Sequence, residues 1–201
     1  GHNKSSFLKQ AVEHIDITSF DARPIIDSMS KMSFVSRETS NAAKIFNNML
    51  GDKDCTIFLT LAGSTSAAGC MQLYADLVKY NMVDAIVATG ASIIDMDFFE
   101  ALGFKHYQGS QFEDDSVLRK NYIDRIYDTY IDEDQLQCCD RTIGEIADTL
   151  EPKAYTSREF IFELGRYLKS KSKKKDSLIE LATKTFQFFV QLLPTALLVS
   201  G

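Results

Sequence analysis

Two turns made only of small residues are the segments in which this sequence could hold a phosphate group. Residues 63–69 are Gly-Ser-Thr-Ser-Ala-Ala-Gly, and residues 89–92 are Thr-Gly-Ala-Ser. Without bulky side chains, backbone N–H groups at the start of a following helix can approach a phosphate closely. The dinucleotide fingerprint G-x-G-x-x-G is absent. Since any tight strand-to-helix turn also needs small residues for packing, both interpretations stay open.

The ionisable residues near these turns allow a second set of hypotheses. Asp95 follows the second turn, where an acidic side chain can accept hydrogen bonds from a ribose hydroxyl. An aspartate in the first turn of a helix is also explained by its favourable interaction with the helix dipole. His14 and His106 are isolated along the chain, and we expect no catalytic role for either. The hydroxyls of residues 64–66 could be nucleophiles only beside a base, and none is evident.

Neither the acidic residues nor the cysteines predict a metal site. The pairs Asp114–Asp115 and Asp132–Asp134 resemble metal-binding clusters, but they lack the glycine and the terminal glutamate of a calcium loop. We expect them in a solvated loop. The cysteines lack zinc-ligand spacing and are expected to be reduced thiols: Cys55, Cys70, Cys138 and Cys139.

The two turns follow apolar runs that predict the strands of a sheet. Residues 55–62 and 83–88 are nearly continuous apolar, β-branched runs, typical of parallel strands that are buried on both faces. Helices are predicted after each turn, the first ending near Asn81 and the second at Gly103, and residues 104–107 are predicted as a third strand. This order predicts a parallel α/β sheet with both turns at the carboxyl ends of its strands, where ligands bind.

Helices are predicted on either side of this unit in the sequence. Residues 3–50 are predicted to be helical, with Gly51 ending the last helix. Residues 110–135, acidic and rich in tyrosine, are predicted to leave the sheet. Helices are expected near 136–150, 157–168 and 177–184; Asp176 is expected to cap the last one, after a solvated basic connector at 171–175.

Composition excludes some classes of function. The chain has 201 residues, of which 45% are apolar, and a net charge of −6, which disfavours nonspecific nucleic-acid binding. The longest apolar stretch, 186–199, is shorter than the ~20 residues of a membrane span and is interrupted by polar residues and Pro194. Residues 1–2 are interpreted as a tag remnant, and with no evident signal peptide we expect a cytoplasmic protein.

Several segments together resemble the deoxyhypusine synthase family, in particular its bacterial deoxyhypusine synthase-like, homospermidine synthase-like branch. The most specific is Asn-Met-Val-Asp at 81–84, followed by an apolar strand and Thr89-Gly90. The resemblance runs collinearly from about residue 20 to 184. It is carried by CTIFLTLAGSTSAAGCMQ (55–72), LVKYNMVDAIVATGASIIDMDFFEALGFKHYQGS (77–110), NYIDRIYDTYIDE (121–133) and LEPKAYTSREFIFELGRYL (150–168).

The resemblance implies the N-terminal half of a doubly wound, Rossmann-like sheet that binds NAD. In the family, NAD oxidises spermidine, a lysine of the enzyme takes up the aminobutyl group, and a protein lysine or a free amine receives it. Members are homotetramers with NAD and polyamine between paired subunits. By position, the resemblance assigns NAD contacts to Ser64, Thr65, Ser66, Thr89, Gly90, Ala91 and Asp95. Ala67 and Ala68 replace serines of the eukaryotic enzymes, which favours the bacterial branch.

The end of the chain departs from the family pattern. Where the family continues with a peptide resembling NVPIFCPAFTDSSAGFG, residues 185–201 are TFQFFVQLLPTALLVSG. One coding string for the family peptide, translated one nucleotide later, yields TFQFFVQLLPTALLVS and then glycine. We therefore hypothesise a one-base frameshift near codon 184; a genuine apolar terminal element is the alternative. The predicted division is a tag remnant (1–2), an N-terminal helical segment (3–54), a partial NAD-binding α/β domain (55–184) and a non-family apolar tail (185–201).

Two functions follow as hypotheses. In the first, the chain is part of an NAD-dependent aminobutyltransferase acting on spermidine. It is expected to be inactive alone because the family's catalytic lysine lies further along. In the second, it is a non-catalytic NAD-binding or scaffold protein that pairs with a complete subunit. Half of a doubly wound sheet would leave apolar faces and a strand edge open, which predicts association; residues 186–190 are strand-like and could pair with that edge.

Overall fold

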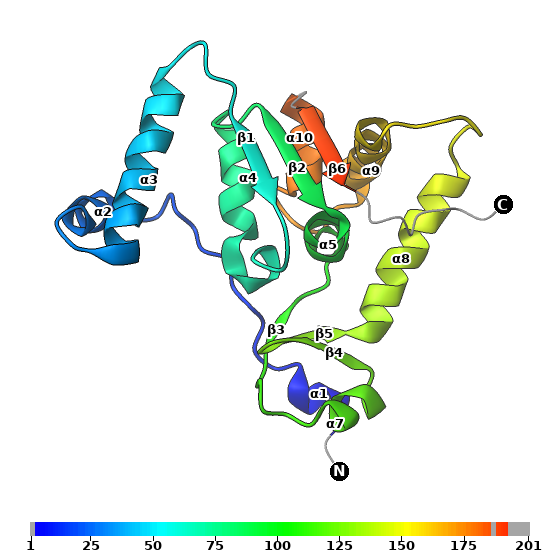
Figure 1. The fold of residues 1–201 in the computed structure, drawn as a ribbon. Helices are drawn as coiled ribbons and strands as arrows, with labels where there is room; N and C mark the ends of the chain where they lie inside the picture. Colours follow the sequence, from blue (N-terminus) through cyan, green and yellow to red (C-terminus); the bar gives the residue numbers. More distant parts are fainter. Residues whose placement is uncertain (1–2, 186–187, 193–201) are drawn as a thin grey trace.

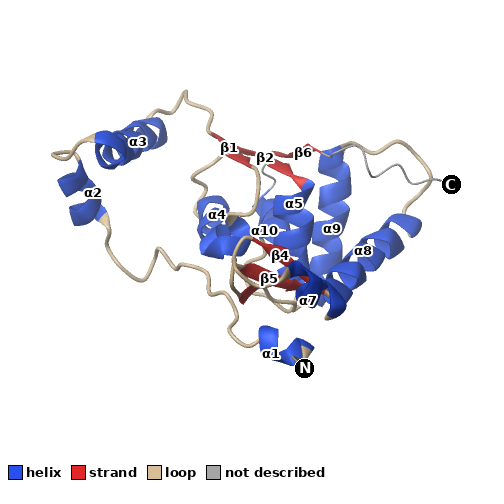
Figure 2. Ribbon diagram, turned by 60° about the horizontal axis from the view of Figure 1, so that its bottom comes forward, coloured by secondary structure: helices blue, strands red, loops and turns tan. Residues whose placement is uncertain are grey.

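A three-stranded parallel sheet forms the centre of the computed structural model, which describes residues 3–185 and 188–192. The strands are β1 (Phe58–Leu61), β2 (Ala85–Thr89) and β6 (Phe188–Leu192), in the order β1-β2-β6. Leu61 pairs with Ala88, and Ala85 pairs with Phe188. Figure 2 shows helices on one side of this sheet, namely α4 (Met71–Lys79), α9 (Ser157–Lys171) and α10 (Leu178–Thr185).

The sheet confirms the predicted α/β class and corrects the identity of its third strand. Residues 104–107 do not join the parallel sheet; β6 takes the place beside β2, as expected for a strand near 186–190. The segment after Gly103 is short, and its Phe104 and His106 pack against Phe99, with ring centroids 5.3 Å and 5.0 Å away. This packing directs the chain out of the sheet.

The segment that leaves the sheet forms a second, antiparallel sheet, consistent with the predicted excursion. Its strands are β3 (Tyr107–Gln108), β4 (Ile123–Ile126) and β5 (Thr129–Asp132), in the order β3-β5-β4. Figure 1 shows α1 (Lys4–Phe7) and α7 (Asp115–Lys120) beside it. Asp132 then caps α8 (Glu133–Asp148) by accepting hydrogen bonds from the backbone N–H of Asp134 and Gln135. Its position at the start of a helix explains part of the acidic sequence at 132–134.

The N-terminal region is less helical than predicted. Only α1, α2 (Arg23–Met29) and α3 (Phe34–Gly51) are helices within residues 3–51; residues 8–22 form none. Backbone groups of residues 10–15 bond instead to β3 and to the first turn, which holds them extended. Helix α2 begins with Pro24 in its first turn, and α3 ends at Gly51 as expected.

One face of the sheet and the α2–α3 pair are poorly covered. We expected β1 to be buried on both faces, but Phe58 is 60% exposed and Thr60 is exposed, while Leu61 is buried. The reason is that α3, which precedes β1, stands away from the sheet (Figure 1). Ser40 is the one fully buried residue of α3; Phe46 and Met49 are half-buried against the core, whereas Phe34, Val35, Ile45 and Leu50 are exposed. Across residues 3–185 and 188–192, no helix has the length and apolar character to cross a bilayer.

Candidate functional site

The two small-residue turns lie side by side at the carboxyl end of the parallel sheet. Since β1 and β2 pair in register, the turns that follow Leu61 and Thr89 leave the sheet at the same edge. The Ser92 hydroxyl donates a hydrogen bond to the Gly63 carbonyl oxygen at 3.0 Å, and it lies 3.3 Å from the Thr89 hydroxyl. The structure thus brings together the turns that the sequence places 26 residues apart, measured from Gly63 to Thr89.

The first turn continues into a short helical segment, η1 (Ser66–Cys70), that ends against α4. Gly63 and Gly69 have φ angles of 73° and 102°, a left-handed region that glycine enters without steric cost. The N–H of Ala68 donates to the Ser64 carbonyl oxygen, and the N–H of Cys70 donates to that of Thr65. These bonds make residues 64–70 one hydrogen-bonded turn.

The three hydroxyls predicted to contact NAD have different surroundings. Ser64 is half-buried, and the exposed Thr65 shares a 2.7 Å hydrogen bond with the Tyr74 hydroxyl. Ser66 is only 1% exposed, and its hydroxyl has no hydrogen-bond partner among the residues that the structure describes. A buried hydroxyl without a partner is uncommon, because its desolvation is not compensated. Ser66 therefore retains an unused hydrogen-bonding group at this turn.

The second turn opens a continuous helical run. Thr89 is extended, with φ −78° and ψ 158°, and α5 (Gly90–Ser92), η2 (Ile93–Phe98) and α6 (Phe99–Ala101) follow without a break. The first N–H groups of such a run have no intrahelical acceptor and carry a partial positive charge. Gly90 is half-buried and Ala91 is exposed, so neither side chain blocks these groups.

Asp95 lies one turn further along this run and faces other acidic groups. Burial, followed by the charge of Asp140, raises the pKa of Asp95 to about 6. Cys139 of α8 is a further neighbour, and burial and the charges of Asp140 and Asp95 raise the pKa of its thiol. The helix-dipole explanation for Asp95 is thus incomplete, because the dipole alone would favour an ionised carboxylate.

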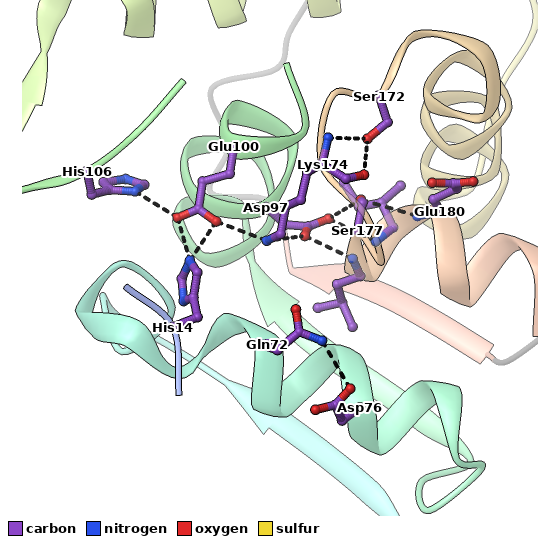
Figure 3. Close-up of polar contacts among 12 residues, drawn as sticks. His14, Gln72, Asp76, Asp97, Glu100, His106, Ser172, Lys174, Ser177 and Glu180 are labelled. Carbon is purple, nitrogen blue, oxygen red and sulfur yellow. Dashed lines mark hydrogen bonds and ion pairs between the residues drawn. The ribbon is translucent and has the colours of Figure 1, made fainter. Parts of the chain in front are cut away.

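The far end of the helical run carries a cluster of charges that the sequence did not predict (Figure 3). Glu100 accepts hydrogen bonds from His14 Nε2 at 2.7–2.8 Å, from His106 Nδ1 at 3.1 Å and from Lys174 Nζ at 2.9 Å. Burial would raise the pKa of Glu100, but the two histidines and the charge of Lys174 outweigh it and hold that pKa well below its ordinary value. The prediction that both histidines are isolated is wrong for the folded chain, because both bind Glu100.

The basic connector is only partly solvated, which is a second correction. Lys174 is 15% exposed at its side chain because it points at Glu100 and lies 3.7 Å from Asp97. The side chain of Lys173 packs against Gly103, whose φ of 96° brings the two segments together. Spacing along the chain could not reveal this, since the partners come from 74 residues away.

The predicted cap of the last helix is also wrong. Asp97, fully buried, accepts hydrogen bonds from the Ser177 hydroxyl and from the N–H groups of Leu178 and Ile179 at 2.7–2.9 Å. It therefore caps α10 from another helix. Asp176 instead accepts a 2.7 Å bond from Lys79, and its backbone is left-handed, with a φ of 59°.

The Asn-Met-Val-Asp segment at 81–84 has a structural role. Asn81 takes a φ of 55° and ends the turn after α4. The Asp84 carboxylate accepts a 2.7 Å hydrogen bond from the N–H of Ile57, while the N–H of Asp84 donates to the Ile57 carbonyl oxygen. These bonds fix the register of β1 on β2, and this register places the two following turns next to each other.

Comparison with known proteins places this fold and its turns in a family. A sequence profile of deoxyhypusine synthase matches residues 24–186. The chain belongs to the deoxyhypusine synthase family. It is 68% identical over 180 residues to a deoxyhypusine synthase-like protein of Coxiella burnetii and 64% identical over 182 residues to one of Caulobacter vibrioides. A probable deoxyhypusine synthase 2 of Methanosarcina acetivorans is 33% identical over 173 residues.

The deoxyhypusine synthase relatives are longer than this chain. The matches cover 86–90% of the chain but 50–51% of each of these three relatives, so the chain spans about half their length. A crystal structure assigned as a deoxyhypusine synthase, from Entamoeba histolytica, superposes with a TM-score of 0.58 at 17% identity. The superposition covers 90% of this chain and 63% of the Entamoeba chain, and at this identity it is evidence for the fold only. The family match ends at residue 186; the frameshift stays a prediction, and residues 193–201 lie outside the described part.

Proposed function

We propose that the paired turns 63–69 and 89–92 bind the diphosphate of NAD. The observation that carries this proposal is the Ser92–Gly63 hydrogen bond, which joins the two turns at the carboxyl edge of a parallel sheet. Ligands of open parallel sheets bind at that edge, and the free N–H groups at the start of a helix favour phosphate. The buried Ser66 hydroxyl adds a donor that lacks a partner within the described chain.

The proposed contacts divide between phosphate and ribose. Ser64, Thr65, Ser66, Thr89, Gly90 and Ala91 would surround the diphosphate with hydroxyl and backbone donors. Asp95 would accept hydrogen bonds from a ribose hydroxyl. Its raised pKa fits a carboxylate whose hydrogen-bond donors come with the ligand, because it accepts none from the residues described here. Nicotinamide would supply the hydride-accepting chemistry.

We propose that the chain is the dinucleotide-binding part of a bacterial deoxyhypusine synthase-like transferase. The family activity, implied by the resemblance, is NAD-dependent transfer of the aminobutyl group of spermidine to a lysine or amine acceptor. No catalytic residue is assigned in this chain, and we expect it to be inactive alone. We also propose a cytoplasmic protein that forms a homo-oligomer. The oligomer would cover the exposed apolar side chains of α2, of α3 and of the turn between them: Ile25, Met32, Phe34, Val35, Ile45 and Leu50.

The same exposed surface favours a second candidate function. A non-catalytic, NAD-binding or scaffold protein that pairs with a complete subunit would use the α2–α3 face and the open face of β1, where Phe58 is exposed. Adding the chain to a full-length relative separates the two functions. Stimulation of the relative's turnover supports the scaffold, whereas an absence of stimulation together with NAD binding supports the transferase part.

Calorimetric titration of NAD tests the site itself. Ala91 is exposed at the start of the helical run, so Ala91→Asp places a negative charge where the phosphate would lie without disturbing the core. We expect this variant to bind NAD at least about tenfold more weakly than the parent chain, since like charges repel. Ala91→Asn, of equal size and no charge, is the matched control and should change affinity by less than about threefold. Equal affinity in both variants would remove the turn from the site. Homospermidine production by the chain alone would refute the expected inactivity.

A further inference from the structure

The extended N-terminal segment, residues 9–16, links the Glu100 cluster to the first turn of the proposed site. The N–H of Gln108 donates to the Gln10 carbonyl oxygen, and the N–H of Val12 donates to that of His106, both at 2.8 Å. Three residues further, the N–H of Ile15 donates to the Gly69 carbonyl oxygen at 2.9 Å. We call residues 9–16 the strap, because they cross from β3 to the first turn.

The strap and Gly69 are in direct backbone contact. A Cβ atom at Gly69 would lie 2.9 Å from the Glu13 carbonyl oxygen, closer than real Cβ contacts allow. The left-handed φ of Gly69, 102°, also disfavours any other residue. Gly69 is thus the residue of the turn that the strap backbone contacts. Two hydrogen bonds within residues 64–70 connect the residues on either side of Gly69 to Ser64 and Thr65, so a shift of Gly69 would also move these two residues.

His14 fixes the strap at this point. It stands between Glu13 and Ile15, the two residues that contact Gly69, and its ring points the other way, to Glu100. Figure 3 shows the His14 ring below the carboxylate, with His106 to its left and the Lys174 nitrogen to its right. The His14 side chain is 16% exposed and that of Glu100 is 11% exposed, so water competes little for this bond.

Glu100 has other partners, so the bond to His14 is not needed to satisfy its charge. His106 and Lys174 bind the same carboxylate, and they anchor it from the residue before β3 and from the connector before α10. Removing the His14 side chain therefore takes away the strap's side-chain tie to Glu100 while leaving the carboxylate paired; the three backbone hydrogen bonds of the strap remain. This separation allows the role of His14 to be measured without dismantling the core.

We propose that His14 is a positioning residue for the proposed dinucleotide site. By holding the strap on Glu100, His14 keeps the strap backbone in contact with Gly69 and keeps the turn 64–70 in the shape that places Ser64, Thr65 and the buried Ser66 at the site. His14 contacts no proposed ligand group; it acts through Gly69. This inference rests on the proposed function for its ligand, but the mechanical coupling can be measured without any ligand.

Hydrogen–deuterium exchange of the full 201-residue chain, read in the peptide that covers residues 63–70, tests the coupling. We expect His14→Leu to raise exchange there roughly tenfold, the loss of one charge-assisted hydrogen bond, with little change in β2. His14→Gln keeps a donor for Glu100 and should restore most of the protection. Lys4→Met is the matched control: it breaks the ties of α1 to Asp132 and Asp134 but touches neither Gly69 nor Glu100.

NAD titration of the same variants separates this inference from the proposed function. Weaker binding by His14→Leu, roughly five- to tenfold, with recovery in His14→Gln, supports the positioning role. Unchanged exchange of residues 63–70 in a folded His14→Leu protein overturns it, whatever the affinity. If the exchange responds but the parent chain binds no NAD, the coupling stands and the proposed function fails.

A second variant covers the case in which His14→Leu does not fold. Gly69→Ala pushes the strap from the turn without removing any of the partners of Glu100. It should raise exchange in residues 63–70 and also in residues 9–16, because the contact is mutual. Protection of both segments equal to that of the parent chain would contradict the coupling.

Discussion

The two ends of the helical run 90–101 differ in residue type: the start carries small neutral residues, and the far end carries buried charges. At its start, two turns of glycine, alanine, serine and threonine meet through one neutral hydrogen bond, and Ser66 keeps an unpaired hydroxyl. At its far end, Glu100 and Asp97 are satisfied by partners from three other segments. At the charged end each carboxylate oxygen of Glu100 and Asp97 has a partner, so these carboxylates serve the fold, although His14 Nδ1 and His106 Nε2 lack a partner among the described residues. The neutral end retains unused donors, which is what a ligand site needs.

The largest effect should come from the charged end. Asp97→Asn leaves an amide donor facing the N–H groups of Leu178 and Ile179, and it leaves Lys174 with one fewer carboxylate nearby. We expect the free energy of unfolding to fall by about 3 kcal/mol. Asp176→Asn, the same change at the wrongly predicted cap, should cost under about 0.5 kcal/mol, because asparagine tolerates the left-handed backbone there. Urea unfolding measures both; equal losses would contradict the assigned cap.

Glu100→Gln should lower the free energy of unfolding by less than Asp97→Asn, and the loss should depend on pH because the glutamate is charged. We expect a loss of about 2 kcal/mol at pH 7. Because the folded pKa of Glu100 lies below its ordinary value, the stabilisation is complete above the unfolded pKa of about 4.3 and is lost as the pH falls toward the folded value. The advantage of the parent chain over Glu100→Gln should therefore shrink between pH 5 and pH 3. A constant difference over this range, in urea unfolding, would mean that Glu100 is not held ionised by its partners.

The neutral end should respond more weakly in stability. Ser92→Ala removes the bond to Gly63 and leaves that carbonyl oxygen without this donor. A loss of about 1 kcal/mol is expected, together with faster exchange in residues 63–66. Thermal unfolding and hydrogen exchange measure the two effects. Faster exchange in α10 rather than in this turn would contradict the role of this bond in joining the two turns.

The smallest expected change has the opposite sign. Ser66→Ala removes a buried hydroxyl that has no partner in the part of the chain described, so stability should stay the same or rise by up to about 1 kcal/mol. NAD affinity should fall at the same time if the hydroxyl is kept for the ligand. Thermal unfolding with and without NAD tests both. A clear loss of stability would show that the hydroxyl serves the fold, and would remove it from the proposed site.

Local patterns determined much of this protein. The apolar runs predicted β1 and β2, the small residues predicted the turns after them, and Gly51 and Asn81 marked where α3 and the turn after α4 end. These features depend on neighbours within a few residues, which the sequence displays directly. The collinear resemblance predicted the family correctly, because it combines many local sequence matches that are each weak.

Only the tertiary structure decided which distant residues meet. It put β6 rather than residues 104–107 beside β2, gave the cap of α10 to Asp97, and gathered His14, His106 and Lys174 on Glu100. A buried carboxylate must find partners wherever packing brings donors, and sequence separation carries no information about that. The two turns were visible in the sequence. The strap that presses on one of them exists only because the chain folds back across Gly69.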